Sequence, residues 1–262
     1  SSQRCRRLSK IPLIRQLSMT EFTGKTAVVT GATRGIGRAI AESFLQHKCK
    51  VVGVYGSNQE EAKRFRAQWP ADQLQLEHCN VADHDQVARF YEGLESRFDT
   101  LDILVNNAGI QIDTESGILE LDPVIFQNTL ETNALGPLLM AQATVPIMKV
   151  NGFGRIVNLV STLGSLAEIA SPDSPYNSVL SPAYRLSKTL LNGITVLLAK
   201  ELRGSNILVN SVCPGWVRTD MGGSAASIDT GASAAGLVAR FAALNPATTG
   251  CFETFEGKAH PY

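Results

Sequence analysis

This chain of 262 residues lacks several features that mark common protein classes. Lysine plus arginine equals aspartate plus glutamate, 24 of each, so there is no basic excess of the kind that nucleic-acid binding requires. No apolar run approaches the ~20 residues of a membrane helix. Even the apolar stretch 190–199 contains Asn192 and Thr195. The sequence therefore predicts neither a nucleic-acid-binding nor a membrane-spanning protein.

Ligands for metals and candidates for disulfides are also few. The five cysteines are odd in number and form no Cys-x-x-Cys pair, and the four histidines show no ligand-like spacing. We therefore expect free thiols in a reducing compartment, with no metal site.

The first eighteen residues differ in composition from the rest. They carry five basic residues and many serines, with no acidic residue before Glu21. This pattern is typical of an organelle transit segment, and a disordered tail is the alternative. We place residues 1–23 outside the fold and predict one domain over 24–262. The predicted location is cytoplasmic, with a mitochondrion or plastid as the alternative.

Apolar β-branched runs alternate with segments of helical periodicity, which is typical of a parallel sheet covered on both faces. We predict a single α/β domain with a Rossmann-type, doubly wound parallel sheet of about seven strands. The predicted strands are Thr26–Thr30, Val51–Tyr55, Leu74–Cys79, Ile103–Asn106, Arg155–Val160, Ile207–Val212 and Cys251–Phe255. The predicted helices are Gly35–His47, Gln59–Gln68, His84–Arg97, Pro123–Met148, Pro182–Leu202 and Ala232–Ala243. Asp83 is predicted to cap the third helix, and glycines 152 and 154 to end the fourth.

A glycine-rich turn joins the first predicted strand to the first helix. Gly31, Gly35 and Gly37 are spaced G-x-x-x-G-x-G. Strand, glycine turn and helix in this order suit a dinucleotide phosphate, because glycines allow close backbone approach and a helix N-terminus offers N–H groups. Alone, the triplet fits an ordinary turn equally well.

Tyr184 and Lys188 lie four residues apart and so share one face of a predicted helix. A cation beside a phenol favours the phenolate, so we expect Lys188 to lower the pKa of Tyr184. Such a tyrosine is suited to general acid–base chemistry. The spacing alone also fits a pair on a helix surface. Tyr176 has a leucine at the fourth following position and is not a candidate.

From about Gly24 to its C-terminus, the chain resembles the short-chain dehydrogenase/reductase family. The motifs occur in the family's order: Thr30-Gly31-x-x-x-Gly35-Ile36-Gly37, Asn106-Asn107-Ala108-Gly109, Asn133, Ser161, Tyr184-x-x-x-Lys188 and Pro214-Gly215. The segment from Leu159 to Lys188 and the ending Phe255-Glu256-Gly257 look like those of its carbonyl reductases.

This resemblance implies four catalytic residues. Tyr184 would donate a proton, Ser161 would hold the carbonyl oxygen, and Lys188 would contact the nicotinamide ribose. Asn133 would hold a water linking Lys188 to solvent.

The resemblance also implies the residues that bind a nicotinamide cofactor, including Tyr184 and Lys188 themselves. The others are Gly31, Thr33, Arg34, Gly35, Ile36, Gly37, Ser57, Asn58, Asn80, Val81, Asn107, Ala108, Gly109, Pro214, Gly215, Val217 and Thr219. Part of the pair Asn106-Asn107 could instead hold neighbouring strands together.

Two positions favour NADP(H) over NAD(H). The second strand ends Tyr55-Gly56-Ser57-Asn58, without the carboxylate that binds the ribose 2′-hydroxyl of NAD. Arg34 lies where a guanidinium would suit a 2′-phosphate, although it could equally be a solvated loop charge.

We therefore expect an NADPH-dependent oxidoreductase that reduces a small ketone, aldehyde, diketone or quinone. A 3-oxoacyl thioester reductase and a non-catalytic, cofactor-binding sensor are the alternatives. The segment 167–182 is longer than in compact relatives and is predicted to be a loop that lines the substrate pocket, obstructs assembly, or both. The family's tendency to form homo-oligomers is weakened by it. Segment 218–235 is predicted to be a flexible lid, with Trp216 and Met221 either lining the pocket or packing in the core.

Overall fold

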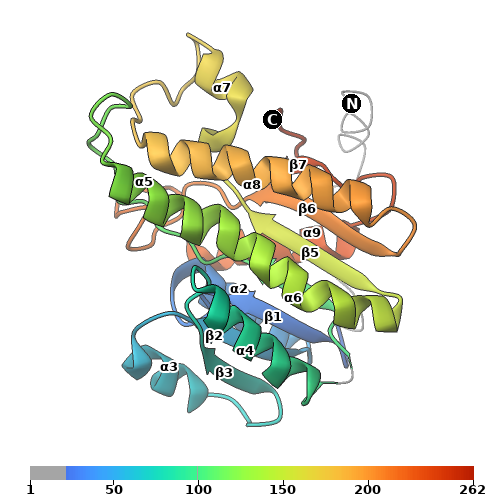
Figure 1. Ribbon diagram of the computed structural model, residues 1–262. Coiled ribbons are helices and arrows are strands. Elements are labelled where there is room, and N and C mark those ends of the chain that lie inside the picture. The colour runs from blue at the N-terminus through green and yellow to red at the C-terminus, as the bar shows by residue number, and fades with distance from the viewer. Residues whose placement is uncertain (1–21, 99) are drawn as a thin grey trace.

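The computed structural model describes residues 22–98 and 100–262 (Figure 1). Most of the predicted tail lies outside this part of the chain. Phe22 is described, and its buried ring packs edge-on against Phe44 at 5.3 Å between centroids. Phe22, which precedes the predicted domain start at residue 24, therefore packs against the described fold.

The centre of the fold is a seven-stranded, all-parallel sheet in the order β3-β2-β1-β4-β5-β6-β7. The Rossmann-type prediction is confirmed. The strands are β1 (Thr26–Thr30), β2 (Lys50–Tyr55), β3 (Leu74–His78), β4 (Ile103–Asn106), β5 (Gly154–Leu159), β6 (Ile207–Cys213) and β7 (Phe252–Thr254). The order reverses direction beside β1, where β1 pairs with both β2 and β4. Ligands bind at such a switch point, beyond the carboxyl ends of the strands.

Helices cover both faces of the sheet and bury two apolar clusters (Figure 1). One cluster contains residues of α2 (Gly35–Gln46), α3 (Gln59–Arg66) and α9 (Thr230–Ala243). The other contains residues of α4 (His84–Glu95), α6 (Gly136–Asn151) and α8 (Pro182–Glu201). Central strands such as β1 and β4 are buried on both sides and therefore read as mainly apolar runs, whereas the edge strand β3 is only partly buried. Among the helices of the described ranges, none is both long enough and apolar enough to cross a bilayer.

The predicted fourth helix is divided into three parts. α5 (Pro123–Leu130) passes into a π-helical turn over Glu131–Leu135, and α6 continues from there to Asn151. Gly152 ends α6 in the left-handed conformation, with φ of +63°, as predicted. Gly154 does not end the helix, because it is the first residue of β5.

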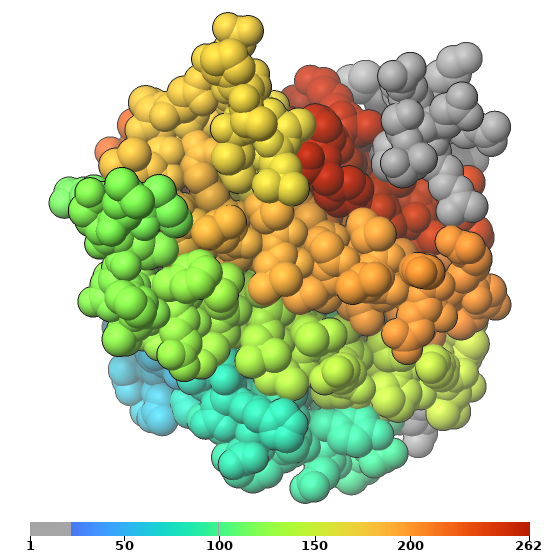
Figure 2. Space-filling model, turned by 45° about the horizontal axis from the view of Figure 1, so that its top comes forward, coloured from blue at the N-terminus to red at the C-terminus, as the bar shows by residue number. Residues whose placement is uncertain are grey.

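The predicted loop at 167–182 contains a short helix. α7 spans Leu166–Ala170, and the side chain of Ser165 accepts a hydrogen bond from the Glu168 N–H at its start. Turns connect α7 to Ser181, the N-cap of α8. This region projects from the body of the protein beside the C-terminal residues (Figure 2).

The predicted lid is more ordered than its composition indicated. Val217 and Ile228 form a β-bridge, and the Arg218 side chain donates to two carbonyls of the same segment, Ala226 O and Ser227 O. From Thr230 onward the chain belongs to α9, which packs on the sheet. Only the part before Thr230 is therefore free of helix.

Candidate active site

A groove of about 1540 Å³ runs along the carboxyl ends of the strands. All predicted catalytic and cofactor-binding residues line it except Gly37 and Asn133. These two lie directly behind its wall, because a Cβ at Gly37 would meet Gly31 O and Asn133 Oδ1 lies beside Gly109. Residues spread over nearly 190 positions of sequence (Gly31 to Thr219) are thus brought to one surface.

The glycine turn fits a dinucleotide phosphate. Gly31 and Gly35 have φ of +66° and +55°, and a Cβ at Gly37 would come within 2.3 Å of Gly31 O. Arg34, the N-cap of α2, makes no side-chain hydrogen bond to the first turn of the helix. The first N–H groups of α2 are therefore left to a ligand, and a helix N-terminus favours an anion.

The turn is held from β4 by a small hydrogen-bond network. Thr30 Oγ1 accepts from the N–H groups of Asn107 (2.9 Å) and Ala108 (3.0 Å). The Asn107 amide donates back to Thr30 O at 2.8 Å. Asn107 therefore both lines the groove and braces the turn, and Thr30 was missing from the predicted site residues. A hydroxyl at the last position of β1 was the available signal.

Asn106 has the strand-holding function that was one of the two alternatives. Its amide nitrogen donates to Asn158 Oδ1 on β5 at 2.8 Å and to Pro137 O at 3.3 Å. The side chain is buried away from the groove.

Charged side chains gather where the adenosine half of a dinucleotide would lie. Arg34 is exposed, and its Nη1 is 3.3 Å from Asp220 Oδ2 of the lid segment. Arg38 pairs with Glu42 (2.9 Å) and Glu61 (3.6 Å), which also line the groove. These two carboxylates are thus matched by Arg38, whereas Arg34 shares only an exposed, solvated pair.

Tyr184 and Lys188 project from one face of α8 into the groove. Both are nearly buried, at 9% and 4% exposure, and Lys188 Nζ lies 5.6 Å from the centre of the Tyr184 ring. Lys188 Nζ donates to Leu159 O at 2.9 Å. Ser161, just past β5, hydrogen-bonds the Tyr184 phenol. Three of the four predicted catalytic side chains, Ser161, Tyr184 and Lys188, therefore lie close together in the groove.

The expected lowering of the Tyr184 pKa by Lys188 is wrong for the protein alone. Burial raises the pKa of Tyr184, with a further rise from the Cys213 thiol, and the Ser161 hydrogen bond only partly opposes this. Burial lowers the pKa of Lys188 from 10.5 to about 8. The same low-polarity surroundings penalise both charged forms, and helical spacing could not reveal this. The phenol consequently keeps its proton at neutral pH, as a proton donor requires.

Asn133 occupies the π-helical turn and is fully buried. Its amide exchanges two 2.8 Å hydrogen bonds with the backbone of Ile110 and donates to Ser187 Oγ at 3.0 Å. Ser187 Oγ in turn donates to Tyr184 O at 2.7 Å. Asn133 therefore ties the loop after β4 to α8, and π-helical turns are frequent at functional sites. Its predicted part in holding a water stays a prediction.

Asp113 is a site residue that the sequence reasoning missed. Its Oδ2 accepts from the backbone N–H groups of Ala183 (2.6 Å) and Tyr184 (3.3 Å) and so caps the start of α8. Ser181, the N-cap of α8, has φ of +55° and supplies no side-chain cap. The capping carboxylate comes from 70 residues earlier in the chain, so no local pattern could identify it.

Comparison with known proteins agrees with this geometry. The family model described as "short chain dehydrogenase" matches residues 25–228. The chain belongs to the short-chain dehydrogenase/reductase family. Its members are oxidoreductases that use NAD(P), so the predicted enzyme class is confirmed.

Curated relatives of this short-chain dehydrogenase/reductase cover three quarters of it. They include a 3alpha-hydroxysteroid dehydrogenase of Mediterraneibacter gnavus, 34% identical over 75% of each chain. They also include the 3-oxoacyl-acyl-carrier-protein reductase FabG of Aquifex aeolicus, 34% identical over 77% of each chain.

Solved structures resemble it over a greater length. NADPH-bound carbonyl reductase from chicken fatty liver is 26% identical, with a TM-score of 0.80 over 92% of this chain and 100% of that one. A metagenomic short-chain oxidoreductase in complex with NADP is 28% identical, with a TM-score of 0.70 over 84% and 92%. The carbonyl reductase Sniffer of Drosophila melanogaster, 24% identical with a TM-score of 0.82 over 92% and 100%, shares the fold.

Two segments of this short-chain dehydrogenase/reductase line the end of the groove near Tyr184. The 167–182 insertion contributes Pro175, Tyr176 and Val179, so it lines the groove, which was one of its predicted roles. Trp216 and Met221 also line the groove and are exposed, which excludes the core-packing alternative.

Proposed function

We propose that this enzyme reduces a carbonyl group to an alcohol with NADPH as the hydride source. The observation that carries the proposal is the grouping of Ser161, Tyr184 and Lys188 in one part of a groove whose other end fits a dinucleotide. The carbonyl reductase and NADP-bound structures among its neighbours support it.

Each residue of the site has a separate role in the proposed reduction. The cofactor, when bound, supplies the hydride. Gly31, Gly35 and the start of α2 would hold its phosphates, because their backbone is open to close approach. Ser161 holds the substrate oxygen, and Tyr184 delivers the proton from its hydroxyl. The Lys188 ammonium adds positive charge beside an oxygen that becomes negative, a preorganised electrostatic contribution.

Replacement of one oxygen atom tests the mechanism. Tyr184→Phe removes the proton donor and keeps the ring, so kcat should fall at least 10²-fold, the scale of general acid catalysis. The variant should still bind NADPH, measured by fluorescence titration. Tyr176→Phe is the matched control, because Tyr176 lines the same groove and is not the proposed proton donor. Near-normal turnover by Tyr184→Phe would refute the mechanism.

We propose NADPH rather than NADH on the strength of Arg34 and of the missing carboxylate after β2. The Arg34–Asp220 pair is exposed on both sides, so a 2′-phosphate can displace Asp220 at little cost. Arg34→Glu should raise the KM for NADPH about 10- to 100-fold and leave the KM for NADH nearly unchanged, because a like charge opposes only the phosphate. An unchanged NADPH KM would remove Arg34 from the site.

The 3-oxoacyl thioester reductase remains the second candidate, favoured by the FabG relatives. Such an enzyme would need basic residues to receive a carrier protein, but the guanidinium of Arg218, beside the groove, donates to two backbone carbonyls of the lid segment. Steady-state assays with NADPH, simple ketones, diketones, quinones and a 3-oxoacyl thioester separate the two. A cofactor-binding sensor would show NADPH binding and no turnover on any of them.

A further inference from the structure

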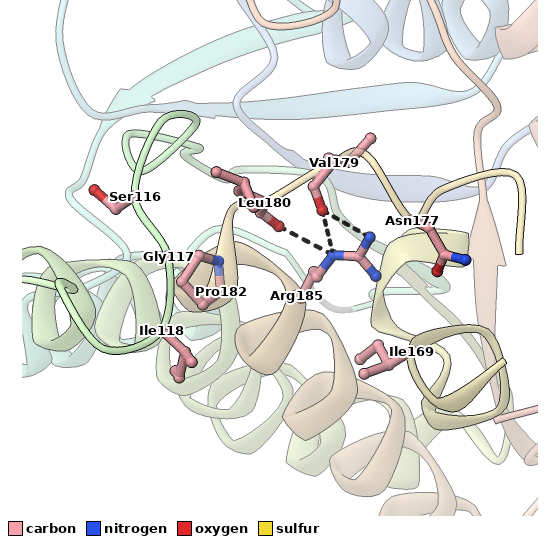
Figure 3. A pocket seen from close by; sticks show the side chains of 9 residues that line it. All are labelled: Ser116, Gly117, Ile118, Ile169, Asn177, Val179, Leu180, Pro182 and Arg185. Atoms are coloured by element: carbon pink, nitrogen blue, oxygen red, sulfur yellow. Dashed lines mark hydrogen bonds between the residues drawn. The ribbon is translucent and has the colours of Figure 1, made fainter. Parts of the chain in front are cut away.

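Residues 171–180, here called the cap segment, separate two hollows of the surface. Pro175, Tyr176 and Val179 line the active-site groove. Asn177, Val179 and Leu180 line a second, smaller pocket of about 220 Å³ (Figure 3). Val179 borders both. The position of the cap segment therefore sets the shape of the groove on the side of Tyr184.

One side chain of α8 holds this segment. Arg185 Nε donates to Leu180 O (3.0 Å) and Val179 O (3.2 Å), and Nη2 donates to Val179 O (2.9 Å) and Tyr176 O. Nη1 reaches Leu163 O, in the short 3₁₀-helical turn Thr162–Gly164 after Ser161, at 3.5 Å. Figure 3 shows the guanidinium reaching from α8 to the backbone of the cap segment.

The guanidinium is directed at backbone rather than at an acid. No carboxylate within the described ranges lies at salt-bridge distance from Arg185. Arginine offers five donors in a rigid fork, so it can hold several carbonyls in one arrangement. A lysine ammonium is a compact point charge and cannot reproduce that spread.

The cap segment has few other anchors. It contains no helix or strand, and its own hydrogen bonds are turns such as Val179 N–H to Tyr176 O (3.1 Å). Its first part is held from elsewhere, because Ser174 Oγ donates to Glu168 on α7 (2.7 Å), and Glu168 lies 3.7 Å from His260 of the C-terminal segment. Tyr176 and Val179, which line the groove, are therefore held mainly by Arg185.

We propose that Arg185 is a positioning residue that sets which substrates fit, by holding the cap segment beside Tyr184. Arg185 directly follows Tyr184 on α8, so the proton donor and the anchor of the substrate wall belong to one turn of helix. This proposal rests on the carbonyl reduction proposed for the groove. Arg185 itself does not line the groove and has no part in the chemistry.

The first test compares Arg185→Met and Arg185→Lys with wild type on a small carbonyl, such as a short aliphatic diketone, and a bulky aromatic one. For the bulky substrate we expect kcat/KM to fall about tenfold, mainly through KM, because remote contacts contribute binding energy. For the small substrate, which does not span the groove to the cap segment, the change should stay under about threefold. The NADPH Kd should be unchanged. Lys200→Met, an exposed site near the other end of α8, is the matched control.

A double-mutant cycle with Tyr176→Ala completes the test. If Arg185 acts through the cap segment, Arg185→Met should add little to the loss that Tyr176→Ala already causes for the bulky substrate, because coupled residues are not additive. Equal losses on both substrates, additive effects, or no difference from Lys200→Met would overturn the proposal. Should Arg185→Met not fold, the same cycle is read with Arg185→Lys. Wild-type enzyme that turns over no carbonyl would refute the proposed function instead, so the two failures are distinguishable.

Discussion

Replacing Lys188 by methionine should stabilise the fold while abolishing activity. The ammonium is almost fully buried, and in the described ranges no carboxylate lies at salt-bridge distance from it. Burial lowers its pKa from 10.5 to about 8. A difference of this size corresponds to about 3 kcal/mol of unfavourable free energy at pH 7, where both the folded and the unfolded chain hold the proton.

Methionine has a similar shape and no charge, so Lys188→Met removes this penalty. The carbonyl of Leu159 then loses its donor, which costs about 1 kcal/mol. The net expectation is a gain of about 2 kcal/mol in the free energy of unfolding at pH 7, measured by urea denaturation. Lys200→Met, at an exposed position of the same helix, should change stability by less than about 0.5 kcal/mol.

The pH dependence separates this mechanism from simple repacking. Between pH 8 and 10.5 the folded protein has released the Lys188 proton and the unfolded chain has not, so wild-type stability rises with pH in that window. The penalty should shrink to about 1 kcal/mol at pH 9.5, and the advantage of Lys188→Met should then nearly vanish. A variant less stable than wild type at pH 7, or an advantage that does not shrink with pH, would refute the reasoning.

Two further substitutions test the residues that position the catalytic side chains, Gly109 and Asp113. Gly109→Ala places a Cβ 3.2 Å from Asn133 Oδ1 and 3.5 Å from Lys188 Nζ, so kcat should fall about tenfold because these groups are displaced. The control is Gly193→Ala, at an exposed position of α8 with open space around it. This variant should keep its kcat, and its free energy of unfolding in urea should rise by up to about 1 kcal/mol. Asp113→Ala removes the cap of α8 and should cost about 1–3 kcal/mol of unfolding free energy, and Asp113→Asn, which keeps an oxygen acceptor, should cost less. Equal losses for the alanine and asparagine variants would show that capping is not the function of Asp113.

Features that depend on neighbours in sequence could be predicted. The strand–glycine–helix unit around Gly31 depends on local conformation, and the side-chain period of a helix alone places Tyr184 and Lys188 on one face. All seven strands could likewise be located, most of them from apolar runs, because a strand that is buried on both sides leaves that pattern. Two of the predicted strands match to the residue, and the edges of the other five differ by one residue, where hydrogen bonding rather than composition decides the boundary.

Features that depend on distant parts of the chain could not be predicted. Asp113 caps a helix that begins 69 residues later, at Pro182, and the amide of Asn133, within the π-helical turn, pairs with the backbone of Ile110, 23 residues earlier. The prediction of a lowered pKa for Tyr184 was wrong for the same reason. Helical spacing identified Lys188 as a neighbour of the right charge, but only the fold shows the burial that raises the pKa of Tyr184. The helix α7 was hidden because its five residues are too few for periodicity to register.

Several features of α8 serve the proposed active site and lower the stability of the fold. Its first turn needs a remote carboxylate, and its third and fourth residues bear the phenol and the anchor of the cap segment. Its buried face carries the Lys188 ammonium, which has no acidic partner among the residues that the structure describes. Residues selected for stability alone would be apolar at Lys188 and self-capping at Ser181. A buried cation with a lowered pKa in a groove is instead the expected sign of a functional site. The same burial that destabilises the Lys188 ammonium strengthens its attraction for a developing negative charge, because both effects follow from the low local dielectric. Stability and catalysis are therefore opposed at this one residue, and a variant that gains one must lose the other.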